Sequence, residues 1–547
     1  MQKVLTAAQM REVDRLTTEK YGIPSILLME NAAHAVARVI TEKLGGSVEG
    51  RRILILCGKG NNGGDGAALA RILWNQGASC FVDLIGSVSE TTGDARINFD
   101  AVKAIDESPD TNGPNENCLL INEISEDNRE TFFYNWRSQH ICVFVDALFG
   151  TGLTRPLEGS FKKIAEAVSR AKERHLFEKV IAIDMPSGLD ADCKINGSIC
   201  ANVDVTVTFT SPKPANILPP ASNFNGELMI ANIGSPMELI DEQPSNLYLA
   251  EREDSANWLK EATFSTSDYK NTRGHSLIIA GSESYSGAAV LAGNAAMRSG
   301  VGLVTVVTSK SSKDLVASRI LPEVMVRGVA ETDGGAISEE AFNEIGELWS
   351  KADSVAIGCG LSQDESTRLF VKKVVEDRRQ PTIVDADALN LLSPFDGFAA
   401  NGESQCPLIL TPHEGEFMRL LGTTDKEAIK DRVAAVRDFA VKHNVILVLK
   451  GERVLIGEPG GKVVVNPTGN SGLGKAGNGD TLAGILAGFV AQASVMNIDI
   501  FETVVAAVYV AGMAGDVAEK KYGKRVMTAS DVRECLSEVF EGFKNER

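Results

Sequence analysis

Two glycine-rich loops, each followed by a helix-like segment, are the parts of this sequence best suited to chemistry. The first is GKGNNGGDG (residues 58–66), with an Asp near its end, and the second is NPTGNSGLGKAGNGD (residues 466–480), which ends in an Asp. Residues this small let backbone N–H groups converge on one point, and the N-terminus of a following helix adds its positive end. Both loops are therefore candidates for binding an anionic or polar ligand beside a carboxylate.

The second loop predicts phosphate binding and phosphoryl transfer. A nest of N–H groups stabilises the charge that develops on a phosphoryl group. Asp480 is then placed as a general base that deprotonates a hydroxyl for attack on a terminal phosphate. The loop lacks the G-K-[ST] signature of a Walker loop, and an Asp follows its G-x-G-x-x-G match at residues 472–477. The structural alternative is an N-cap Asp on a glycine-rich turn.

The first loop matches the dinucleotide fingerprint G-x-G-x-x-G over residues 58–63, with Asp83 about twenty residues further on. Asp65 argues against that interpretation, because a pyrophosphate needs bare backbone N–H groups at the start of the helix. Asn61, Asn62 and Asp65 carry side-chain oxygens that orient a polar ligand or a cation. A tight turn with Asp65 as an N-cap is the structural alternative.

Acidic residues also end two later apolar runs of the first half. Asp146 lies in VDALFGTG (residues 145–152) and Asp184 in IDMPSGLD (residues 183–190), close to Ser187. In an open α/β sheet, ligands bind outside the carboxyl ends of the strands. A single Asp at the end of a strand is more often a cap or turn residue. Three strand ends that each carry Asn or Asp beside glycines instead predict one site.

Further candidates end the apolar runs of the second half. Asp385 and Asp387 in VDADAL are placed where metal-bound phosphates could lie. His413 is one of only six histidines and is followed by acidic residues in PHEGEF, which favours a functional over a purely structural role. Lys450 ends the run VILVLK in a position that suits a nucleotide phosphate or ribose.

Short apolar runs alternate with helical stretches, the pattern of a parallel sheet covered by helices. Predicted strands in the first half span residues 53–57, 80–85, 141–147, 180–184, 203–208 and 226–233. The pattern restarts at residues 275–280, 302–307, 354–357, 382–384, 408–410 and 445–449. The predicted organisation is a first domain over 1–235, a linker over 236–264 containing Pro236 and Pro244, and a second domain over 265–547.

Length and composition agree with two globular domains. A chain of 547 residues is too long for one core, because single cores stop growing at about 250–300 residues. The net charge of −18 argues against non-specific binding to nucleic acid or to an anionic membrane. The nine cysteines contain no C-x-x-C, so neither a zinc site nor a disulfide framework is expected. Charges at residues 11–15 exclude a signal peptide, which leaves a cytoplasmic protein.

The uncharged stretch at residues 481–498 is long enough to suggest a membrane span. Three features argue against one: Gly484 and Gly488 dilute it, polar residues interrupt it, and it directly follows a glycine loop. A span needs about 20 mostly apolar residues. A buried helix is the better interpretation.

The first half resembles the NAD(P)H-hydrate epimerases over most of residues 1–235. The resemblance rests on QMREVD (9–14), LLMENAA (27–33), GKGNNGGDG (58–66), VDALFGTG (145–152) and DMPSGLD (184–190). Those enzymes interconvert the R and S epimers of hydrated nicotinamide cofactors and hold a potassium ion. The resemblance implies a Rossmann-like three-layer sandwich.

Site residues follow from the epimerase motifs. Asn62, Asp146 and Ser187 would supply potassium ligands, and oxygen ligands suit such a hard cation. Asp184 is the expected proton carrier, with Asp65 second. The residues expected to contact the hydrate are Asn61, Asn62, Gly63, Gly64, Asp65, Gly150, Thr151, Gly152, Leu153, Thr154, Arg155, Pro156 and Asp184.

The second half resembles the NAD(P)H-hydrate dehydratases, members of the ribokinase-like superfamily, over about 265–545. The matching segments are KNTRG (270–274), GSESYSGAA (281–289), AMRSGVGLV (296–304), GCGL (358–361), VDADAL (384–389), PHEGEF (412–417) and GNGDTLAG (477–484). Those enzymes use ADP or ATP to dehydrate the S-hydrate to NADH or NADPH. The implied route phosphorylates the ring hydroxyl and then expels phosphate, with Mg²⁺ on the nucleotide.

On this resemblance Asp480 would be the base, and Ala288, Gly360, His413 and Asp480 would contact the hydrate. The nucleotide would bind Lys450, Gly451, Glu452, Arg453, Val454, Asn470, Ser471, Gly472, Leu473, Gly474, Lys475, Ala476, Gly477, Asn478 and Gly479. The sequence departs from the family pattern in that Tyr269 replaces a frequent His, Cys359 a frequent Pro, Ser362 a frequent Gly and Asn478 a frequent Thr.

The resemblances together predict a bifunctional repair enzyme of the α/β class, acting on the hydrates NADHX and NADPHX with K⁺, Mg²⁺ and ADP or ATP. A homo-oligomer without nucleic-acid or membrane partners is expected. A ribokinase-like kinase of a small molecule, such as a vitamin precursor, fused to a binding domain is the main alternative. A Rossmann dehydrogenase module conflicts with Asn61, Asn62 and Asp65. A catalytically dead scaffold conflicts with the presence of Asp184 and Asp480.

Overall fold

The computed structural model describes residues 1–108, 117–125, 141–194, 199–397 and 406–544. The chain forms two compact units, one over Gln2–Ser245 and the other over Asn246–Arg547, with which Met1 also groups. Residues 236–264, expected as a linker, are folded and are divided between the units. They form α7 (Met237–Asp241), β9 (Leu247–Leu249) and α8 (Arg252–Glu261).

The N-terminal unit is built on a parallel sheet with the strand order β4-β3-β2-β5-β6-β7-β8. Its strands are β2 (Arg52–Cys57), β3 (Ser79–Ile85), β4 (Leu119–Ile124), β5 (Val143–Ala147), β6 (Lys179–Ile183), β7 (Val205–Phe209) and β8 (Glu227–Ala231). The chain order reverses between β2 and β5. This reversal is a topological switch point, where ligands bind outside the carboxyl ends of the strands.

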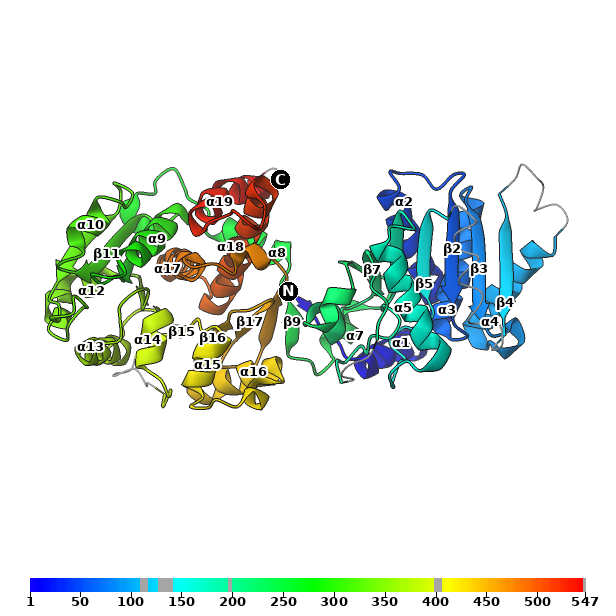
Figure 1. Cartoon of the computed structure of the whole chain (residues 1–547), viewed down its shortest axis with the longest axis horizontal. Helices are drawn as coiled ribbons and strands as arrows, with labels where there is room; N and C mark the ends of the chain where they lie inside the picture. Colours follow the sequence, from blue (N-terminus) through cyan, green and yellow to red (C-terminus); the bar gives the residue numbers. More distant parts are fainter. Residues whose placement is uncertain (109–116, 126–140, 195–198, 398–405, 545–547) are drawn as a thin grey trace. The chain divides into compact units, whose positions relative to one another are not determined.

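Helices cover both faces of this sheet, which explains why its strands are continuously apolar. Ile53 and Ile55 of β2 belong to one core cluster, whereas Leu54 and Leu56 belong to another on the opposite face. The helices are α1 (Ala7–Tyr21), α2 (Ser25–Lys43), α3 (Asn61–Asn75), α4 (Gly93–Asp106), α5 (Gly159–Glu173) and α6 (Pro214–Ile217), besides α7. The predicted three-layer α/β sandwich is confirmed (Figure 1).

The C-terminal unit is built on a mixed sheet that runs β9-β18-β17-β16-β15-β14-β13-β10-β11-β12. Its strands after β9 are β10 (His275–Ile279), β11 (Leu303–Ser309), β12 (Met325–Val329), β13 (Ser354–Ile357), β14 (Thr382–Val384), β15 (Leu408–Leu410), β16 (Ile446–Leu449), β17 (Val454–Gly457) and β18 (Val463–Asn466). Strand β17 is antiparallel to β16 and β18, and the other pairs among these strands are parallel.

The helices of this unit complete the layers around its sheet. They are α9 (Ser286–Arg298), α10 (Lys313–Ala317), α11 (Ala341–Glu344), α12 (Gly346–Lys351), α13 (Glu365–Glu376), α14 (Ala386–Leu391), α15 (Glu414–Leu420), α16 (Arg432–His443), α17 (Asn478–Met496), α18 (Ile500–Tyr522) and α19 (Ala529–Lys544).

The uncharged stretch after the second glycine loop forms α17, which lies inside the C-terminal unit against α9 and α18 (Figure 1). Phe489 of α17 stacks on Trp258 with ring centroids 4.3 Å apart. A Cβ on Gly484 would overlap the carbonyl oxygen of Ala292 in α9, so this glycine permits the close approach of the two helices. Both α17 and α18 are long and apolar enough to span a membrane, and two thirds of each apolar window is buried. The predicted buried helix is therefore a core helix.

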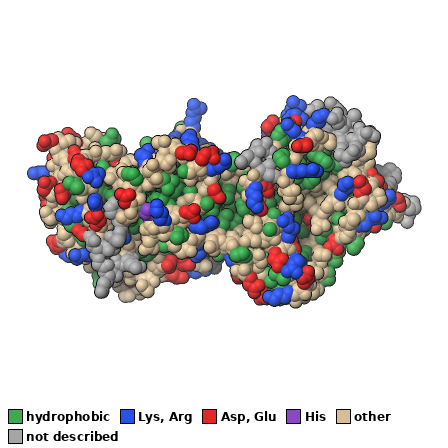
Figure 2. All heavy atoms as spheres, turned by 90° about the horizontal axis from the view of Figure 1, so that it is seen from below, with side chains coloured by type: hydrophobic (Ala, Val, Ile, Leu, Met, Phe, Trp, Pro, Cys, Tyr) green, Lys and Arg blue, Asp and Glu red, His purple; other side chains and the backbone are tan. Residues whose placement is uncertain are grey.

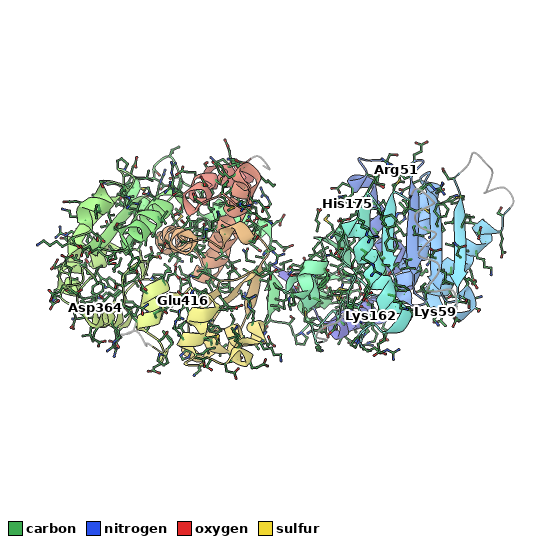
Figure 3. All side chains as sticks on the ribbon, in the orientation of Figure 1. Arg51, Lys59, Lys162, His175, Asp364 and Glu416 are labelled. Atoms are coloured by element: carbon green, nitrogen blue, oxygen red, sulfur yellow. The ribbon has the colours of Figure 1, made fainter. Side chains whose placement is uncertain are left out.

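Charged side chains of both signs are interspersed on the face shown in Figure 2. The net charge of −18 makes the average surface potential negative. In the N-terminal unit, Figure 3 shows Lys59 and Lys162 at one end of the sheet and Arg51 and His175 at the other. Lys59 follows the carboxyl end of β2, so its end of the unit is the one at which a ligand is expected.

Candidate active sites

A cavity of about 600 Å³ lies in the N-terminal unit at the carboxyl ends of β2, β5 and β6. It is placed at the switch point of the sheet, as the topology requires. The polar and charged side chains on its wall are Arg11, Asp14, Ser25, Lys59, Asn61, Asn62, Asp65, Asp94, Thr151, Asp184 and Lys213. The first glycine loop and two of the later strand ends therefore meet at one site, as the sequence predicts.

The first glycine loop is shaped by close packing between α3 and β2. Helix α3 begins at Asn61 with Gly60 as N-cap and without a side-chain cap. Asp65 consequently lies inside the first turns of the helix, so the alternative interpretation of Asp65 as an N-cap is wrong. A Cβ on Gly63 would overlap the carbonyl oxygen of Gly58, and one on Gly66 would lie 2.7 Å from the sulfur of Cys57.

The loop after β5 brings Asn62 and Asp184 together. A Cβ placed on Gly150 would lie 3.0 Å from Asp184 Oδ2 and 3.3 Å from Asn62 Oδ1. Oδ1 and Nδ2 of Asn62 are both buried without a hydrogen-bond partner among the described residues. A buried amide is normally paired, so this side chain is free for a ligand.

Asp146 and Ser187 are held together by hydrogen bonds. Ser187 donates its hydroxyl to Asp146 Oδ1 at 2.6 Å and its backbone N–H to Oδ2 at 2.8 Å. The Ser187 hydroxyl in turn accepts the N–H of Phe149 at 3.0 Å. Burial raises the pKa of the Asp146 carboxyl, and the hydrogen bonds from Ser187 oppose that rise. Asp146 thereby ties the loop after β6 to the loop after β5.

Asp184 is fixed by a buried lysine and a backbone amide. Lys213 Nζ donates to Asp184 Oδ1 at 2.8 Å, to Thr208 Oγ1 at 2.8 Å and to the carbonyl of Phe209 at 3.2 Å. Asp184 Oδ2 accepts the N–H of Thr151 at 3.1 Å. Asp184 also has φ +63°, a left-handed conformation that is strained for a non-glycine residue and typical of functional sites.

Lys213 is the most important residue that the sequence analysis missed. It is 1% exposed, and it lies in the run SPKP between β7 and α6. The one sequence signal for it is its place between two prolines just after a strand, which is an unusual setting for a buried lysine. Nothing in the sequence shows that the lysine meets Asp184, because that contact depends on the pairing of β6 with β7.

Two further carboxyl groups on the cavity wall have raised pKa values. Burial, followed by the charges of Asp184 and Asp14, raises the pKa of Asp65 well above its ordinary value. Burial also raises the pKa of Asp14, to about 6. The charge of Lys213 opposes this rise, and the charge of Asp184 adds to it. The sequence does not identify Asp14 as a site residue. It contributes only to the QMREVD motif, on which the family resemblance partly rests.

The structure brings most, but not all, of the predicted epimerase residues to the cavity. Asn61, Asn62, Asp65, Asp184 and residues 150–153 line it. Gly63 and Gly64 instead pack inside α3, where Cβ atoms would meet Gly58 and Ala95 respectively. The predicted residues that do not contribute to the wall are Gly63, Gly64, Thr154, Arg155 and Pro156.

In the C-terminal unit, the second glycine loop meets the ends of β14 and β16. Lys450 Nζ lies 2.6 Å from Asp385 Oδ1 and 3.9 Å from Glu416 Oε2 of α15, labelled in Figure 3. A Cβ on Gly479 would lie 3.6 Å from Lys450 Nζ. Burial lowers the pKa of Lys450, but Asp385 and Glu416 raise it more, so the net direction is upward.

Asp480 lies in the first turn of α17, as the sequence predicts. Its N-cap is Gly477, which has φ +90° and so needs a glycine. The pKa of Asp480 is raised chiefly by burial, with a further rise from Asp385, whereas the Cys359 thiol and Lys450 lower it. A carboxyl group raised in this way is suited to accept a proton from a hydroxyl.

Side chains of the second loop hold its shape. Asn470 donates to Asp516 Oδ1 at 3.0 Å and accepts the N–H of Gly472 at 2.9 Å. Lys475 donates to the carbonyls of Arg525 at 2.6 Å and Met527 at 2.9 Å. Asn470 and Lys475 therefore act as anchors of the loop in this structure.

Residues expected to contact the hydrate in this unit fall into two groups. A Cβ on Gly360 would lie 2.9 Å from Ala288 Cβ, so these two residues adjoin. His413 caps α15, because its Nδ1 accepts the N–H groups of Gly415 at 3.0 Å and Glu416 at 3.2 Å. The His413 side chain is 56% exposed and remains accessible to a ligand.

Metal sites built from acids, cysteines and histidines are not found among the described residues. No group of three or more His, Cys, Asp or Glu side chains there could hold a metal ion. All nine cysteines are free.

Comparisons with known proteins agree with this division into two sites. Residues 276–538 match the family described as NAD(P)H-hydrate dehydratase, and residues 25–215 match the family described as YjeF-related protein N-terminus. A Bacillus subtilis ADP/ATP-dependent NAD(P)H-hydrate dehydratase, co-crystallised with ATP and Mg²⁺, is 31% identical. The match covers 55% of this chain and 99% of that chain, with a TM-score of 0.46.

Full-length relatives combine both parts. The bifunctional NAD(P)H-hydrate repair enzyme Nnr of Moorella thermoacetica is 36% identical over 99% of this chain and 97% of its own length. The enzyme of the same description from Thermofilum pendens is 31% identical over 100% of this chain and 97% of its own length. The chain thus belongs to the family of bifunctional NAD(P)H-hydrate repair enzymes, which join an epimerase to an ADP/ATP-dependent dehydratase.

Proposed function

We propose that the cavity of the N-terminal unit interconverts the R and S epimers of NADHX and NADPHX, and that the second glycine loop supports dehydration of the S epimer. The observation that carries this division is the presence of two separate carboxylate–lysine centres. Asp184 pairs with Lys213 at one, and Asp385 pairs with Lys450 beside Asp480 at the other.

In the epimerase, Asp184 is proposed as the principal proton carrier. Its two oxygens are held by Lys213 and by the N–H of Thr151, so the carboxyl has one orientation at the cavity wall. Fixed geometry of this kind favours general acid–base catalysis, because the group need not reorganise during the reaction. Residues 150–153 and Asn61 would contact the substrate.

Of the residues predicted to hold potassium, only Asn62 lines the cavity. Its unpartnered amide would supply one oxygen ligand, and Asp146 and Ser187, which lie outside the lining, would supply the others. These are the hard oxygen donors that an alkali cation prefers. When bound, the ion would neutralise negative charge on nearby substrate oxygens.

In the dehydratase, Asp480 would remove the proton of the ring hydroxyl. The hydroxyl oxygen then attacks the terminal phosphoryl group of ADP or ATP, and AMP or ADP leaves. Loss of a proton from the neighbouring carbon and departure of phosphate restore the double bond of NADH or NADPH. The loop over residues 470–479 would bind the phosphates, with residues 450–454 and His413 close by.

Mg²⁺ fits the acidic end of β14. Magnesium is usually held by one or two carboxylates together with substrate phosphates. Asp385 Oδ2 faces the loop, since a Cβ on Gly479 would lie 3.8 Å from it. Asp385 and Asp387 would therefore hold the ion that accompanies the nucleotide and screens the phosphate charge.

We also propose a cytoplasmic homo-oligomer. Nine cysteines, all free, suit a reducing compartment. Size-exclusion chromatography with light scattering on the full chain would determine the oligomeric state.

The function is tested with a mixture of both NADPH-hydrate epimers, ADP or ATP, Mg²⁺ and K⁺. Recovery of the near-ultraviolet absorbance of the reduced nicotinamide ring is followed to completion. Conversion of the entire hydrate content supports both activities. Conversion of the S fraction alone contradicts the proposed epimerase function, and absence of recovery contradicts the proposed dehydratase function.

A further inference from the structure

Asp14 lies on the buried face of α1 and on the wall of the epimerase cavity. Met10, Val13 and Thr17 of the same helix are buried, and Asp14 follows Met10 by four residues, so it shares their face. A carboxyl group on an apolar helix face is costly unless a partner or a ligand compensates it. Its position at the cavity favours a functional explanation.

One oxygen of Asp14 is left without a protein partner among the described residues. Oδ1 is buried and has no hydrogen-bond partner within the part of the chain that the structure describes. Asp184, in contrast, has both oxygens engaged by Lys213 and Thr151. The cavity therefore contains one anchored carboxylate that is paired with an ammonium group and one carboxyl oxygen without a partner.

Epimerisation needs groups of both kinds. Hydration of an enamine places the hydroxyl on the carbon bonded to nitrogen, so inversion requires one bond to that carbon to break and form again. An acceptor must take the hydroxyl proton and a donor must protonate the departing atom, as in any acid–base exchange at a hemiaminal. A single anchored carboxylate supplies only one of the two.

We propose that Asp14 is a second proton-carrying residue of the epimerase, acting opposite the Asp184–Lys213 pair. This proposal rests on the proposed epimerase function of the cavity. The hydroxyl proton passes to the Asp14 carboxylate while the carbon–nitrogen bond breaks and its electron pair goes to nitrogen. The nitrogen takes a proton from the Lys213–Asp184 pair, leaving an aldehyde. Rotation about the adjacent carbon–carbon bond and closure on the opposite face of the aldehyde return both protons and give the other epimer.

Other charged groups of the cavity determine when Asp14 is ionised. Lys213, preceding α6, favours the carboxylate, whereas Asp184 after β6 opposes it. Asp65 on α3 and Asp94 on α4 also line the cavity, as do Arg11 of the same helix and Lys59. With its pKa raised to about 6, Asp14 is ionised at neutral pH and titrates within reach of a rate measurement.

The test uses the full-length protein, no nucleotide and a single purified epimer, so that only epimerisation is observed. The fraction of each epimer is measured by chromatography below and above pH 6. For the wild type we expect kcat/KM to rise with pH through about 6, because Asp14 must lose its proton to act as base. Asp14→Asn should lower kcat by about 10²–10⁴-fold and lose that rise. Asp14→Glu should recover part of the rate and retain a pH-dependent rise.

Chemical rescue separates proton transfer from a structural role. Added formate should restore part of the rate of Asp14→Ala, because a small carboxylate can occupy the vacated space and accept the proton. The matched control is Glu19→Ala, which removes an exposed carboxylate of the same helix outside the cavity lining and should show neither the loss nor the rescue.

The proposal is overturned if Asp14→Asn keeps the wild-type rate and pH profile, or if Asp14→Ala is inactive and formate leaves it so while circular dichroism shows a native fold. A wild-type protein that does not interconvert the epimers at all would instead refute the proposed epimerase function. These results are distinguishable, because only the latter appears before any substitution is made.

Discussion

At the scale of single residues, the epimerase cavity is governed by charges that are buried together. Lys213 compensates Asp184, and its three hydrogen bonds use all the donors of its ammonium group. Removing one partner of a buried ion pair leaves an uncompensated charge, which is far costlier than losing an exposed pair. The electrostatic balance at this site is therefore also a determinant of stability.

Substitution Lys213→Met should destabilise the N-terminal unit by about 3–5 kcal/mol, because Asp184 would stay buried without its counter-ion. The double variant Asp184→Asn/Lys213→Met should regain much of that stability but no epimerase activity. Hydrogen exchange of peptides from β2 and β6 measures the local free energy of opening. Equal destabilisation by the single and double variants would show that the pair is not coupled.

The raised pKa of Asp14 predicts a pH dependence of stability. Its protonated form is favoured in the folded state, so its contribution is complete below the ordinary value of 3.8 and is lost as pH rises through about 6. From the size of the shift, the loss is at most about 3 kcal/mol. Thermal unfolding of wild type and Asp14→Asn between those pH values measures the difference. The variant should show a flatter profile, and parallel profiles would contradict the assignment.

At the scale of elements, glycines allow helices to approach strands and each other at the sites. Gly63 brings the start of α3 against the turn after β2, and Gly484 brings α17 against α9. These contacts place Asn62 and Asp480 at their respective sites. The glycine loops consequently serve packing as much as ligand binding.

Substitution Gly63→Ala should disrupt the first site, since the new Cβ would overlap the carbonyl oxygen of Gly58 and α3 would have to move. We expect a loss of at least about 2–3 kcal/mol and of epimerase activity, as is usual for forced overpacking. Gly60→Ala is the matched control, because nothing lies within 4 Å of its Cβ and its φ is −89°. Similar effects of the two substitutions would refute the packing argument.

Much of the element order was predictable from the sequence, because buried parallel strands are continuous apolar runs of a length that helices exceed. The sequence also predicted that Asn62, Asp65 and Asp184 share a site, since the carboxyl ends of parallel strands meet at one edge. It did not predict Lys213 beside Asp184 or Asp14 at the cavity. Those contacts arise from the loop after β7 and from the docking of α1, neither of which leaves a periodic pattern.

At the scale of the whole molecule, the chain consists of two α/β units, each with its own carboxylate–lysine centre. The range expected as a linker is folded within the units, because α8 packs on α18 and α7 packs on α1. The sequence predicts a linker over 236–264, because Pro236 and Pro244 suggest an open connection there. Pro236 instead lies at the start of α7, where proline is compatible with a helix, so it does not mark an open connection.

Nucleotide binding should stabilise only one unit. ADP with Mg²⁺ should raise the unfolding temperature of the C-terminal unit by mass action and leave that of the N-terminal unit unchanged. Asp385→Asn, which removes a charge at the proposed phosphate site, should weaken the shift. Differential scanning calorimetry resolves the two transitions, and an equal shift of both would contradict independent sites.

Two single variants, each assayed with both purified epimers, show whether each unit performs its own reaction. Asp480→Asn should interconvert the epimers at the wild-type rate and form no NADPH from either. Asp184→Asn should convert the S epimer to NADPH with nucleotide present and leave the R epimer unreacted. Loss of both activities in either folded variant, or loss of neither, would contradict the assignment of one reaction to each site.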